Sequence, residues 1–357
     1  MGWGAEAWER LRGLPLTVES VELSFPRLPL AAWERVTTVI ALEGLGETGL
    51  GEDVNYEAAE HDVVRQHGPP IEAVGTWTLG SFCELVGAAN LFPAGPPAHE
   101  ASLDYRRWAW ESAALDLALR QADTDLATAL DRTPRPVTFV SSARVGSPPT
   151  VAALQPLIDA VPGLRFKLDA DADWDAAFLK ELGALDRVDC IDFKAFYTGT
   201  IVDTDIPPAQ VVEIARAVPE ATLEDAAPGE TTDLLAEHDA HRLSWDAPIH
   251  SVADIDALPI EPKRMNVKPS RIGSIQELLA VYDRLEELGA EMYGGGQFEL
   301  SVGRGQIILL ASLVHPHGAN DTAPVVFHSF TPGGELPSSP LPAPEQLRGF
   351  RWPSDER

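Results

Sequence analysis

"LRFKLDADADWDAAFLKELGALDRVDCIDFK", residues 164–194, contains two short apolar runs separated by one amphipathic stretch. The apolar runs predict strands at 164–169 and 188–194, and the stretch between them predicts a helix at 174–183. Strand, helix and strand at this spacing form the βαβ unit that is typical of parallel sheets. This stretch therefore predicts an α/β fold.

The same alternation continues from Pro134 to about residue 330. We expect eight strands, at 137–141, 164–169, 188–194, 221–224, 243–246, 264–268, 290–293 and 324–328. We expect helices between most of them, at 150–160, 174–183, 207–217, 230–238, 251–257, 274–288 and 303–314. Eight strands with about seven crossovers favour a closed (β/α) barrel over an open sheet.

The residues before Pro134 have a different pattern. A strand meander is expected over 17–56, followed by helices at 57–66, 79–90 and 105–122. "GLGETG" at 44–49 fits a dinucleotide-binding pattern, but the acidic residues around it would repel a pyrophosphate, which favours a hairpin turn. We therefore divide the chain into an N-terminal α+β cap (1–132), a barrel (133–330) and a Pro-rich tail (331–357) that packs back on the cap.

Composition excludes several function classes. The 27 basic and 55 acidic residues give a net charge of −28, which argues against a nucleic-acid partner. No apolar run reaches the roughly 18 residues of a membrane span, and the N-terminus does not resemble a signal peptide. We expect a cytoplasmic protein without a membrane partner. Cys83 and Cys190 lie far apart in apolar surroundings and are expected to be reduced thiols.

Charged residues end several predicted barrel strands, at the edge where barrel chemistry occurs. Asp192, Glu224 and Asp246 end successive strands and are separated by 32 and 22 residues, about one βα unit each. Three carboxylates without His or Cys suit a hard cation, and we predict Mg²⁺, with Mn²⁺ as a possible substitute. Lys268 ends the next strand, where a nearby cation would lower its pKa and allow it to act as a base. The alternative to a metal site is that these charged residues are ordinary polar ends of strands that face solvent.

Asp169 is a second candidate for the first metal ligand. That assignment would leave "VDCIDFK" (188–194) as an extra strand and spoil the barrel count, so we prefer Asp192. "HPHG" (315–318) carries two histidines, but its loop position and lack of partners argue against a metal pair.

The layout and its local sequences resemble the enolase superfamily, in the muconate-lactonizing and o-succinylbenzoate-synthase branch of the mandelate racemase/muconate lactonizing enzyme family. The resemblance covers nearly the whole chain. The motifs that carry it are "LEGLGETGLGE" (42–52), "AWESAALDLALRQ" (109–121), "LEDAAP" (223–228), "WDAPIHSVADI" (245–255), "NVKPSRIGSIQELL" (266–279) and "YGGGQFELSVGRGQ" (293–306).

The resemblance implies an α/β fold in which an α+β cap covers a modified (β/α)₇β barrel, a type of TIM barrel. It also implies one Mg²⁺ and a small-molecule carboxylate substrate. The shared chemistry is abstraction of the proton α to that carboxylate through an enediolate, giving isomerisation, cycloisomerisation or elimination, as an isomerase or lyase. We expect a homo-oligomer. The absence of a histidine near the end of the seventh strand disfavours mandelate-racemase-type and sugar-acid dehydratase chemistry.

The chain departs from the family pattern at two strands. Lys-x-Lys on the second strand is replaced by Lys167-Leu-Asp169, and Asp-x-Asn on the third by Asp192-Phe-Lys194. One hypothesis is a positional exchange, in which Lys194 supplies the ammonium that position 169 lacks and is paired with or tuned by Asp169. Lys194 and Lys167 would then act opposite Lys268. The alternative is an Asp169–Lys194 ion pair that closes the mouth and leaves Lys268 as the sole acid and base.

Three further residues are predicted to contact the substrate: Gln297 and Glu299, which follow the seventh strand, and Tyr56, in a loop of the cap. Two other classes of function stay open. The first is a decayed relative that binds metal or a carboxylate without turnover. The second is a flavin- or nicotinamide-dependent barrel oxidoreductase, with "GGG" (294–296) as its phosphate loop.

Overall fold

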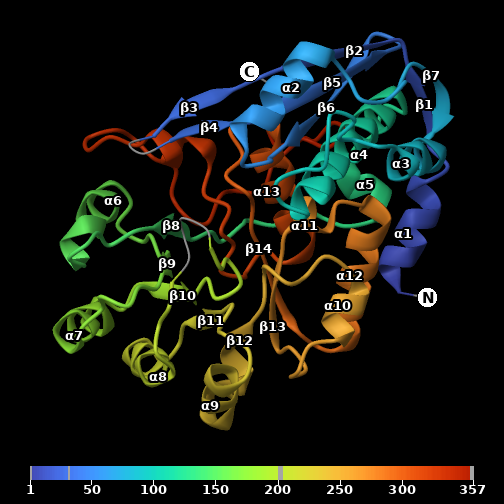
Figure 1. Ribbon diagram of the computed structural model, residues 1–357. Helices are drawn as coiled ribbons and strands as arrows, with labels where there is room; N and C mark the ends of the chain where they lie inside the picture. The colour runs from blue at the N-terminus through green and yellow to red at the C-terminus, as the bar shows by residue number, and fades with distance from the viewer. Residues whose placement is uncertain (1, 31–32, 200–203, 354–357) are drawn as a thin grey trace.

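The structure is a computed structural model in which residues 2–30, 33–199 and 204–353 are described. The few remaining positions of the predicted domains lie outside the described residues. A cap built from the N-terminal third of the chain covers one end of a ring of parallel strands, and helices surround the ring (Figure 1). The expected α/β architecture, a modified TIM barrel with an α+β cap, is confirmed.

The cap combines short antiparallel sheets with five helices among its described residues. Its elements are α1 (Trp3–Leu11), β1 (Pro15–Val18), β2 (Ser20–Ser24), β3 (Arg27–Pro29), β4 (Glu34–Val36), β5 (Thr38–Gly44), β6 (Glu47–Asp53), α2 (Ala58–His67), β7 (Gly75–Thr78), α3 (Leu79–Ala88), α4 (Ala101–Gln121) and α5 (Leu126–Leu130). The strands β2, β5 and β6 form its main sheet.

The glycine pattern at 44–49 forms a hairpin turn, as predicted. Gly44 pairs with Glu47, and the two residues between them have φ values of 54° and 78°. Two consecutive positive φ values are those of a two-residue hairpin turn. The later glycines have a packing role, because a Cβ on Gly51 would lie 2.0 Å from the carbonyl oxygen of Ala109 in α4. The hairpin therefore packs directly on the helix that leads into the barrel.

The barrel strands run parallel. They are β8 (Ser141–Ala143), β9 (Phe166–Asp169), β10 (Val188–Asp192), β11 (Thr222–Glu224), β12 (Leu243–Ser244), β13 (Arg264–Val267) and β14 (Glu291–Gly294). The first five form one sheet in that spatial order, and β13 pairs with β14. Asp169 aligns with Asp192, and Asp192 with Glu224, so the carboxyl ends of these strands lie level.

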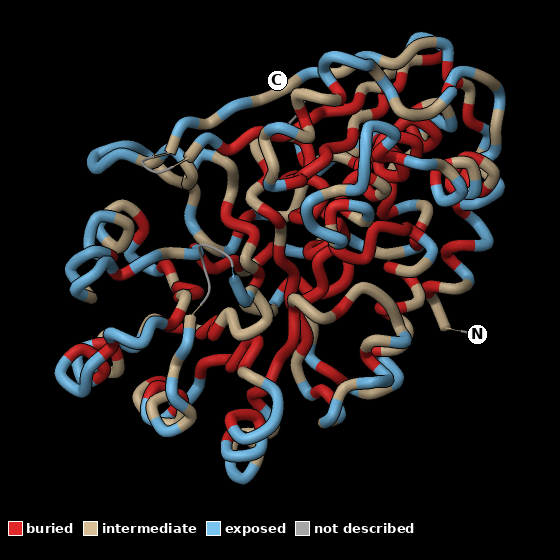
Figure 2. Tube along the Cα trace, viewed as in Figure 1, coloured by how far each residue is buried: buried red, intermediate tan, exposed pale blue. Residues whose placement is uncertain are grey.

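Helices alternate with the strands on the outside of the barrel. They are η1 (Val151–Leu154), α6 (Gln155–Ala160), α7 (Ala176–Leu185), α8 (Pro208–Ala217), α9 (Glu230–Asp239), η2 (Ala240–Arg242), α10 (Val252–Asp256), α11 (Pro269–Ile272), α12 (Ile275–Glu287) and α13 (Val302–Val314). Figure 2 shows the strands and α4 as buried, whereas α7 to α9 expose their outer sides.

The predicted eighth strand at 324–328 is wrong. Residues Val325–Ser329 form a 3₁₀ turn, η3, instead. The eighth position in the ring is taken by residues 320–321, which form parallel bridges to Phe139 on one side and Gly295 on the other. The valine-rich run resembles a strand in composition, but its aromatic residue Phe327 covers the ring of Phe139 at 5.5 Å, and Val326 is 45% exposed.

Both ends of the described chain are tied to distant elements. The backbone N–H of Phe350 donates to Asp116 of α4 at 2.7 Å, and Arg351 forms an ion pair with the same carboxylate at 2.6 Å. At the other end, the N–H of Gly4 donates to Asp283 of α12 at 2.7 Å. The end of the described chain therefore contacts the cap, whereas Ser339 and Leu341 bond to Phe139 and Val137 before the barrel strands. At the other end, α1 links the cap to the barrel. Among the described residues, none of the helices combines the length and the apolar character that crossing a membrane requires.

His315 of the "HPHG" loop is buried and hydrogen-bonded to Asn320. It is 6% exposed, and its Nδ1 lies 2.7 Å from Oδ1 of Asn320. That oxygen also accepts from the N–H of Gly294, so the imidazole nitrogen is the donor. His317 is exposed. The two histidines therefore do not share a site, and His315 buttresses the segment that completes the barrel.

Acid should destabilise the fold through His315. Burial lowers the pKa of His315 to about 4, whereas the pKa of an unfolded-chain histidine is about 6.5. Between these values the unfolded chain binds the proton more readily, so stability falls as pH decreases through this window, by about 2 kcal/mol at pH 5. Urea unfolding at pH 7.5 and pH 5 should show this loss in the wild type and a smaller loss in His315→Gln. Equal losses in the two proteins would contradict the assignment.

Candidate active site and metal centre

Three buried carboxylates converge at the carboxyl ends of neighbouring barrel strands. Asp192 and Glu224 are the last residues of β10 and β11, and Asp246 follows β12 by two residues. One oxygen from each lies within 4.8 Å of the others, and the three residues are 0–1% exposed. Within the described part of the chain, no other group of three His, Cys, Asp or Glu residues has this arrangement.

Glu224 is held in position by neutral donors from the neighbouring strands. The side-chain amide of Asn266 donates to its Oε2 at 2.9 Å, and the hydroxyl of Tyr293 donates to the same oxygen. The Oγ of Ser244 lies 2.9 Å from that hydroxyl. These groups are contributed by β12, β13 and β14, so the orientation of Glu224 depends on closure of the barrel.

Asp225 adjoins the cluster but has a different role. Its carboxylate accepts the backbone N–H groups of Asp246 at 2.8 Å and Ala247 at 3.0 Å. Burial, with a further contribution from the charge of Asp246, raises the pKa of Asp225 well above its ordinary value. Asp225 therefore fixes the backbone that carries the third carboxylate.

A lysine contacts each carboxylate of the cluster. The Nζ of Lys167 lies 3.1 Å from Asp192 and also contacts Glu224. The Nζ of Lys194 contacts Asp192, and that of Lys268 lies 2.6 Å from Asp246. The cluster is therefore enclosed by lysines from β9, the residues just after β10, and the end of β13.

The charges in this group stabilise one another. Burial lowers the pKa of Lys268, but attraction to Asp246 raises it, and the net pKa lies above the ordinary lysine value. Burial likewise opposes ionisation of Asp192, yet Lys167 and Lys194 bring its pKa below the ordinary value. With only the protein's own charged groups around them, Lys268 is protonated and Asp192 is ionised.

The residues of the cluster fit a divalent cation. The donors are all carboxylate oxygens, which suit Mg²⁺ better than a softer metal. Oδ1 of Asn266 is buried and accepts no hydrogen bond from the described residues. Oδ1 of Asp246 accepts none either, although the Nε of Arg271 lies 3.2 Å from it. Buried oxygens without donors are rare in native proteins, which is consistent with a cation as their missing partner.

Asp169 and Lys194, the two residues that depart from the family pattern, form an ion pair. Lys194 Nζ lies 3.4 Å from Oδ1 of Asp169, as well as contacting Asp192. Lys194 has a φ of 54°, the left-handed region, so the chain turns sharply at the end of β10. Asp171, the other acidic residue after β9, is exposed and does not join the cluster.

Arg271 and Tyr197 are residues of the site that the sequence did not single out. The Nε of Arg271 lies 3.2 Å from Asp246, and its Nη2 donates to the hydroxyl of Tyr197 at 2.9 Å. The single-turn helix α11 brings Arg271 back beside Lys268. The "KPSR" run does contain a signal for the position of Arg271. A proline is favoured at the first position of a helix, so the run predicts a helical turn that starts just after Lys268. Tyr197 lies in a loop and had no comparable signal.

The three predicted substrate contacts have different environments. The hydroxyl of Tyr56 donates to Oε1 of Gln297 at 3.3 Å, which joins the cap to the end of β14. Glu299 accepts the N–H of Gln297 at 2.6 Å and pairs with Arg304 at 2.9 Å. Glu299 therefore has partners in its own loop and in α13, whereas Tyr56 and Gln297 form a contact between the cap and the barrel.

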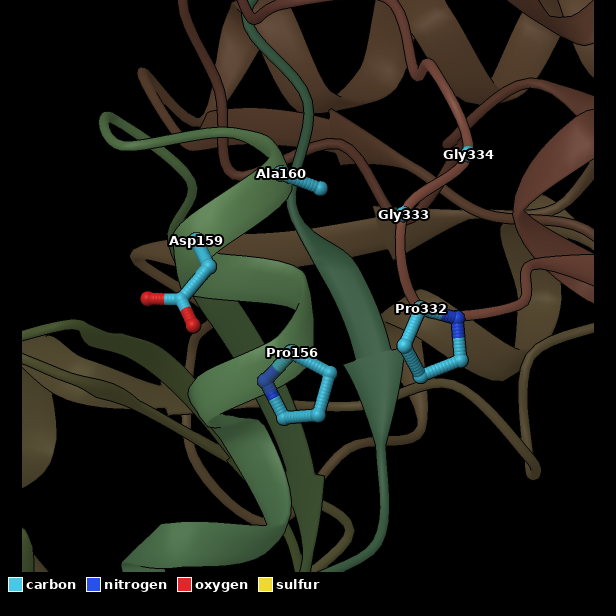
Figure 3. Close-up of a pocket in the computed structure, with 6 residues that line it drawn as sticks. All are labelled: Pro156, Asp159, Ala160, Pro332, Gly333 and Gly334. Atoms are coloured by element: carbon cyan, nitrogen blue, oxygen red, sulfur yellow. The ribbon is translucent and has the colours of Figure 1, made fainter.

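A surface hollow of about 370 Å³ lies elsewhere, between α6 and the loop at 332–334 (Figure 3). It is lined by Pro156, Asp159, Ala160, Pro332, Gly333 and Gly334. Its one charged group, Asp159, accepts a hydrogen bond from Gln155 of the same helix at 2.7 Å. The hollow contains no set of reactive groups comparable to the carboxylate and lysine cluster.

A parallel barrel beneath an α+β cap, with carboxylates on three successive strands and lysines beside them, defines the class: the fold is that of the enolase superfamily. Residues 133–329 match the family described as "Domain of unknown function (DUF8230) C-terminal domain", and residues 9–129 match its N-terminal counterpart. The chain belongs to this DUF8230 family. No curated protein matches its sequence.

Several solved structures share the fold at low sequence identity. A mandelate racemase/muconate lactonizing protein from Herpetosiphon aurantiacus is 17% identical, with a TM-score of 0.71, over 95% of this chain and 98% of that one. Muconate lactonizing enzyme from Pseudomonas putida is 16% identical, with a TM-score of 0.64, over 94% and 93%. A dipeptide epimerase from Methylococcus capsulatus, complexed with Mg ion, is 17% identical, with a TM-score of 0.63, over 86% and 88%.

Proposed function

We propose that this protein is a Mg²⁺-dependent enzyme that removes the proton α to the carboxylate of a small molecule. The observation that carries the proposal is the buried Asp192, Glu224 and Asp246 cluster with Lys268 beside it. An all-oxygen cation site next to a lysine is what proton abstraction beside a carboxylate requires, because the enediolate carries a second negative charge.

Asp192, Glu224 and Asp246 would hold the cation. When bound, Mg²⁺ supplies positive charge that binds the substrate carboxylate, offsets the negative charge of the enediolate and lowers the pKa of nearby amines. Lys268, in its neutral form, would then accept the α-proton at Nζ. Burial of Lys268 at 6% exposure keeps water from competing for that proton.

Lys167 and Lys194 would act on the opposite side of the substrate. Each ammonium can stabilise developing negative charge or return a proton to the product. The reaction would be an isomerisation, a cycloisomerisation or an elimination. The muconate cycloisomerases and the epimerase among the similar structures support an isomerisation or a cycloisomerisation. A cytoplasmic location and a homo-oligomeric state complete the proposal.

A second candidate function is binding of metal or a carboxylate without turnover. Asp169 favours it, since this acidic residue stands where the resembling enzymes carry the second lysine of their second strand. Binding alone predicts a metal site without α-proton exchange. The two candidates therefore differ in one measurable property.

The test combines metal binding with proton exchange. Mn²⁺ binding is followed by electron paramagnetic resonance, and a panel of small carboxylates is incubated in D₂O with the protein and Mg²⁺. The proposal expects one tightly bound Mn²⁺ and deuterium at the α-carbon of at least one carboxylate. Bound Mn²⁺ without deuterium in any compound would favour the second candidate, and absence of Mn²⁺ binding would overturn both.

Lys194→Met distinguishes the two hypotheses for the exchanged lysine. If Lys194 replaces the missing lysine, its loss should slow α-proton exchange by about 10²-fold, the lower end for a proton-transfer group. If it serves only as the partner of Asp169, exchange should change by less than about threefold. Asp169→Asn is the matched control, because it removes the same ion pair and keeps the ammonium.

A further inference from the structure

Gln297 lies where the barrel meets the cap, just beyond the strand that borders Lys268. β14 ends at Gly294, in register with Val267 of β13. A Cβ on the next residue, Gly295, would lie 2.8 Å from Cε of Lys268, so the backbone passes directly against the lysine side chain. Gln297 follows two residues later and is 3% exposed. Gln297 is therefore only two residues from the backbone that contacts Lys268.

The amide of Gln297 has one satisfied end and one unsatisfied end. The hydroxyl of Tyr56 donates to Oε1 at 3.3 Å, which defines the oxygen side of the amide. Nε2 is buried and donates to no hydrogen-bond acceptor among the described residues. Leaving a buried polar group without its partner costs about 1–3 kcal/mol. The arrangement therefore favours a bound molecule that brings an acceptor to Nε2.

Arg35 of β4 holds Gln297 and Tyr56 in this arrangement. Its Nη2 donates to the backbone carbonyl of Gln297 at 2.8 Å and to that of Val54 in the cap at 2.7 Å. Its guanidinium carbon lies 4.5 Å from the centre of the Tyr56 ring, a cation–π contact. Arg35 is fully buried, so the position of Gln297 is set by the cap before a substrate binds.

Tyr105 connects this corner electrostatically with the proton-transfer groups. Burial raises the pKa of Tyr105, and its hydroxyl interacts with the charges of Arg271 and Lys268 on the barrel and with Tyr56 on the cap. Tyr56 contacts Gln297 and Arg35, so Tyr56 acts on this corner through the amide of Gln297. A substrate that binds beside Lys268 therefore needs to pass only the backbone of Gly295 to reach Gln297.

We propose that Gln297 is the specificity-determining residue of the candidate active site. Its Nε2 donates a hydrogen bond to an oxygen acceptor on the substrate, at the end remote from the carboxylate that binds at the metal cluster. Tyr56 and Arg35 are positioning residues that orient the amide. The inference rests on the proposed function and deepens it: the substrate class is a carboxylate with a second, oxygen-bearing group.

The test uses matched pairs of acids that differ only in one acceptor oxygen. Binding of 4-oxopentanoate and pentanoate, 5-oxohexanoate and hexanoate, and 6-oxoheptanoate and heptanoate is measured by titration calorimetry in the presence of Mg²⁺. In the wild type, one oxo acid should bind about tenfold more tightly than its alkyl partner, the value of one hydrogen bond. Gln297→Met should reduce that ratio to within twofold and leave binding of the alkyl acid unchanged.

Two further variants guard against a change in folding. Gln297→Glu keeps the size of the side chain but removes the donor, so the oxo acid should bind no better than the alkyl acid. Tyr56→Phe alters a side chain that is 41% exposed, and by releasing the amide it should lower the preference to about threefold. Circular dichroism of each variant checks the fold.

The outcomes separate this inference from the proposed function. Equal binding of oxo and alkyl acids by the wild type, or an unchanged preference in Gln297→Met, would overturn the role of Gln297 and leave the metal-dependent enzyme intact. Failure of both series to bind would also overturn it. In that case Mn²⁺ binding decides whether the metal site fails as well.

Discussion

Lys268→Arg should slow α-proton exchange by roughly 10³-fold, within the usual range for loss of a general base. Arginine keeps the positive charge beside Asp246, but its pKa is above 12 and it does not release a proton near neutral pH. Mn²⁺ binding and the unfolding midpoint should change little, because the ion pair that Lys268 forms at 2.6 Å can be replaced. The measurement is deuterium incorporation by NMR with the best carboxylate of the panel.

Lys263→Arg is the matched control for this change. Lys263 lies just before the same strand, is exposed, and pairs only with a surface glutamate, Glu261, among the described residues. Exchange in this variant should equal that of the wild type. If Lys268→Arg retained more than a tenth of wild-type exchange, Lys268 would not be the base, and Lys167 or Lys194 would take that role.

The clustering of Asp192, Glu224 and Asp246 could be predicted from the sequence, because neighbouring parallel strands bring their carboxyl ends together. Asp192 and Glu224 each end a short apolar run, and strands of one parallel sheet bring their carboxyl ends to one edge. Asp246 follows a strand of only two residues, yet the repeat of about one βα unit was sufficient to place it. A periodic pattern of this kind is local, so each unit can be recognised alone.

Other features depend on contacts between distant segments. The eighth strand was misplaced because residues 320–321 become extended only by bridging Phe139 and Gly295. The orientation of Gln297 depends on Arg35, which lies more than 260 residues earlier in the chain. The sequence contains both residues, but nothing local indicates that a cap strand and a barrel loop meet there.

The environment of Lys167 also required the structure. Lys167 and Asp169 stand two residues apart on one strand, yet their side chains have different partners. Lys167 is 1% exposed and lies between Asp192 and Glu224, whereas Asp169 is half-buried and pairs with Lys194. Lys167 therefore neutralises Asp192 and Glu224 in this structure, and the role proposed for it beside the substrate requires a bound cation to take that place.

Lys167→Met should destabilise the protein by about 3–5 kcal/mol in the absence of divalent metal, the usual cost of removing one partner of a buried ion pair. Glu224 would keep neutral donors only, from Asn266 and Tyr293. Mg²⁺ should restore most of this loss, since a ligand at 100 times its dissociation constant stabilises by about 2.7 kcal/mol. Urea unfolding with EDTA and with Mg²⁺ measures both effects.

Lys180→Met, at an exposed position of α7, is the control and should change stability little in either condition. The variant at Lys167 should also bind Mn²⁺ more tightly than the wild type, because no ammonium then competes for Asp192 and Glu224. If Mg²⁺ stabilised neither the wild type nor Lys167→Met relative to EDTA, the cation would not bind between these carboxylates. The metal-dependent mechanism would then have to be abandoned. It requires a cation between Asp192 and Glu224, where the ammonium of Lys167 lies in this structure.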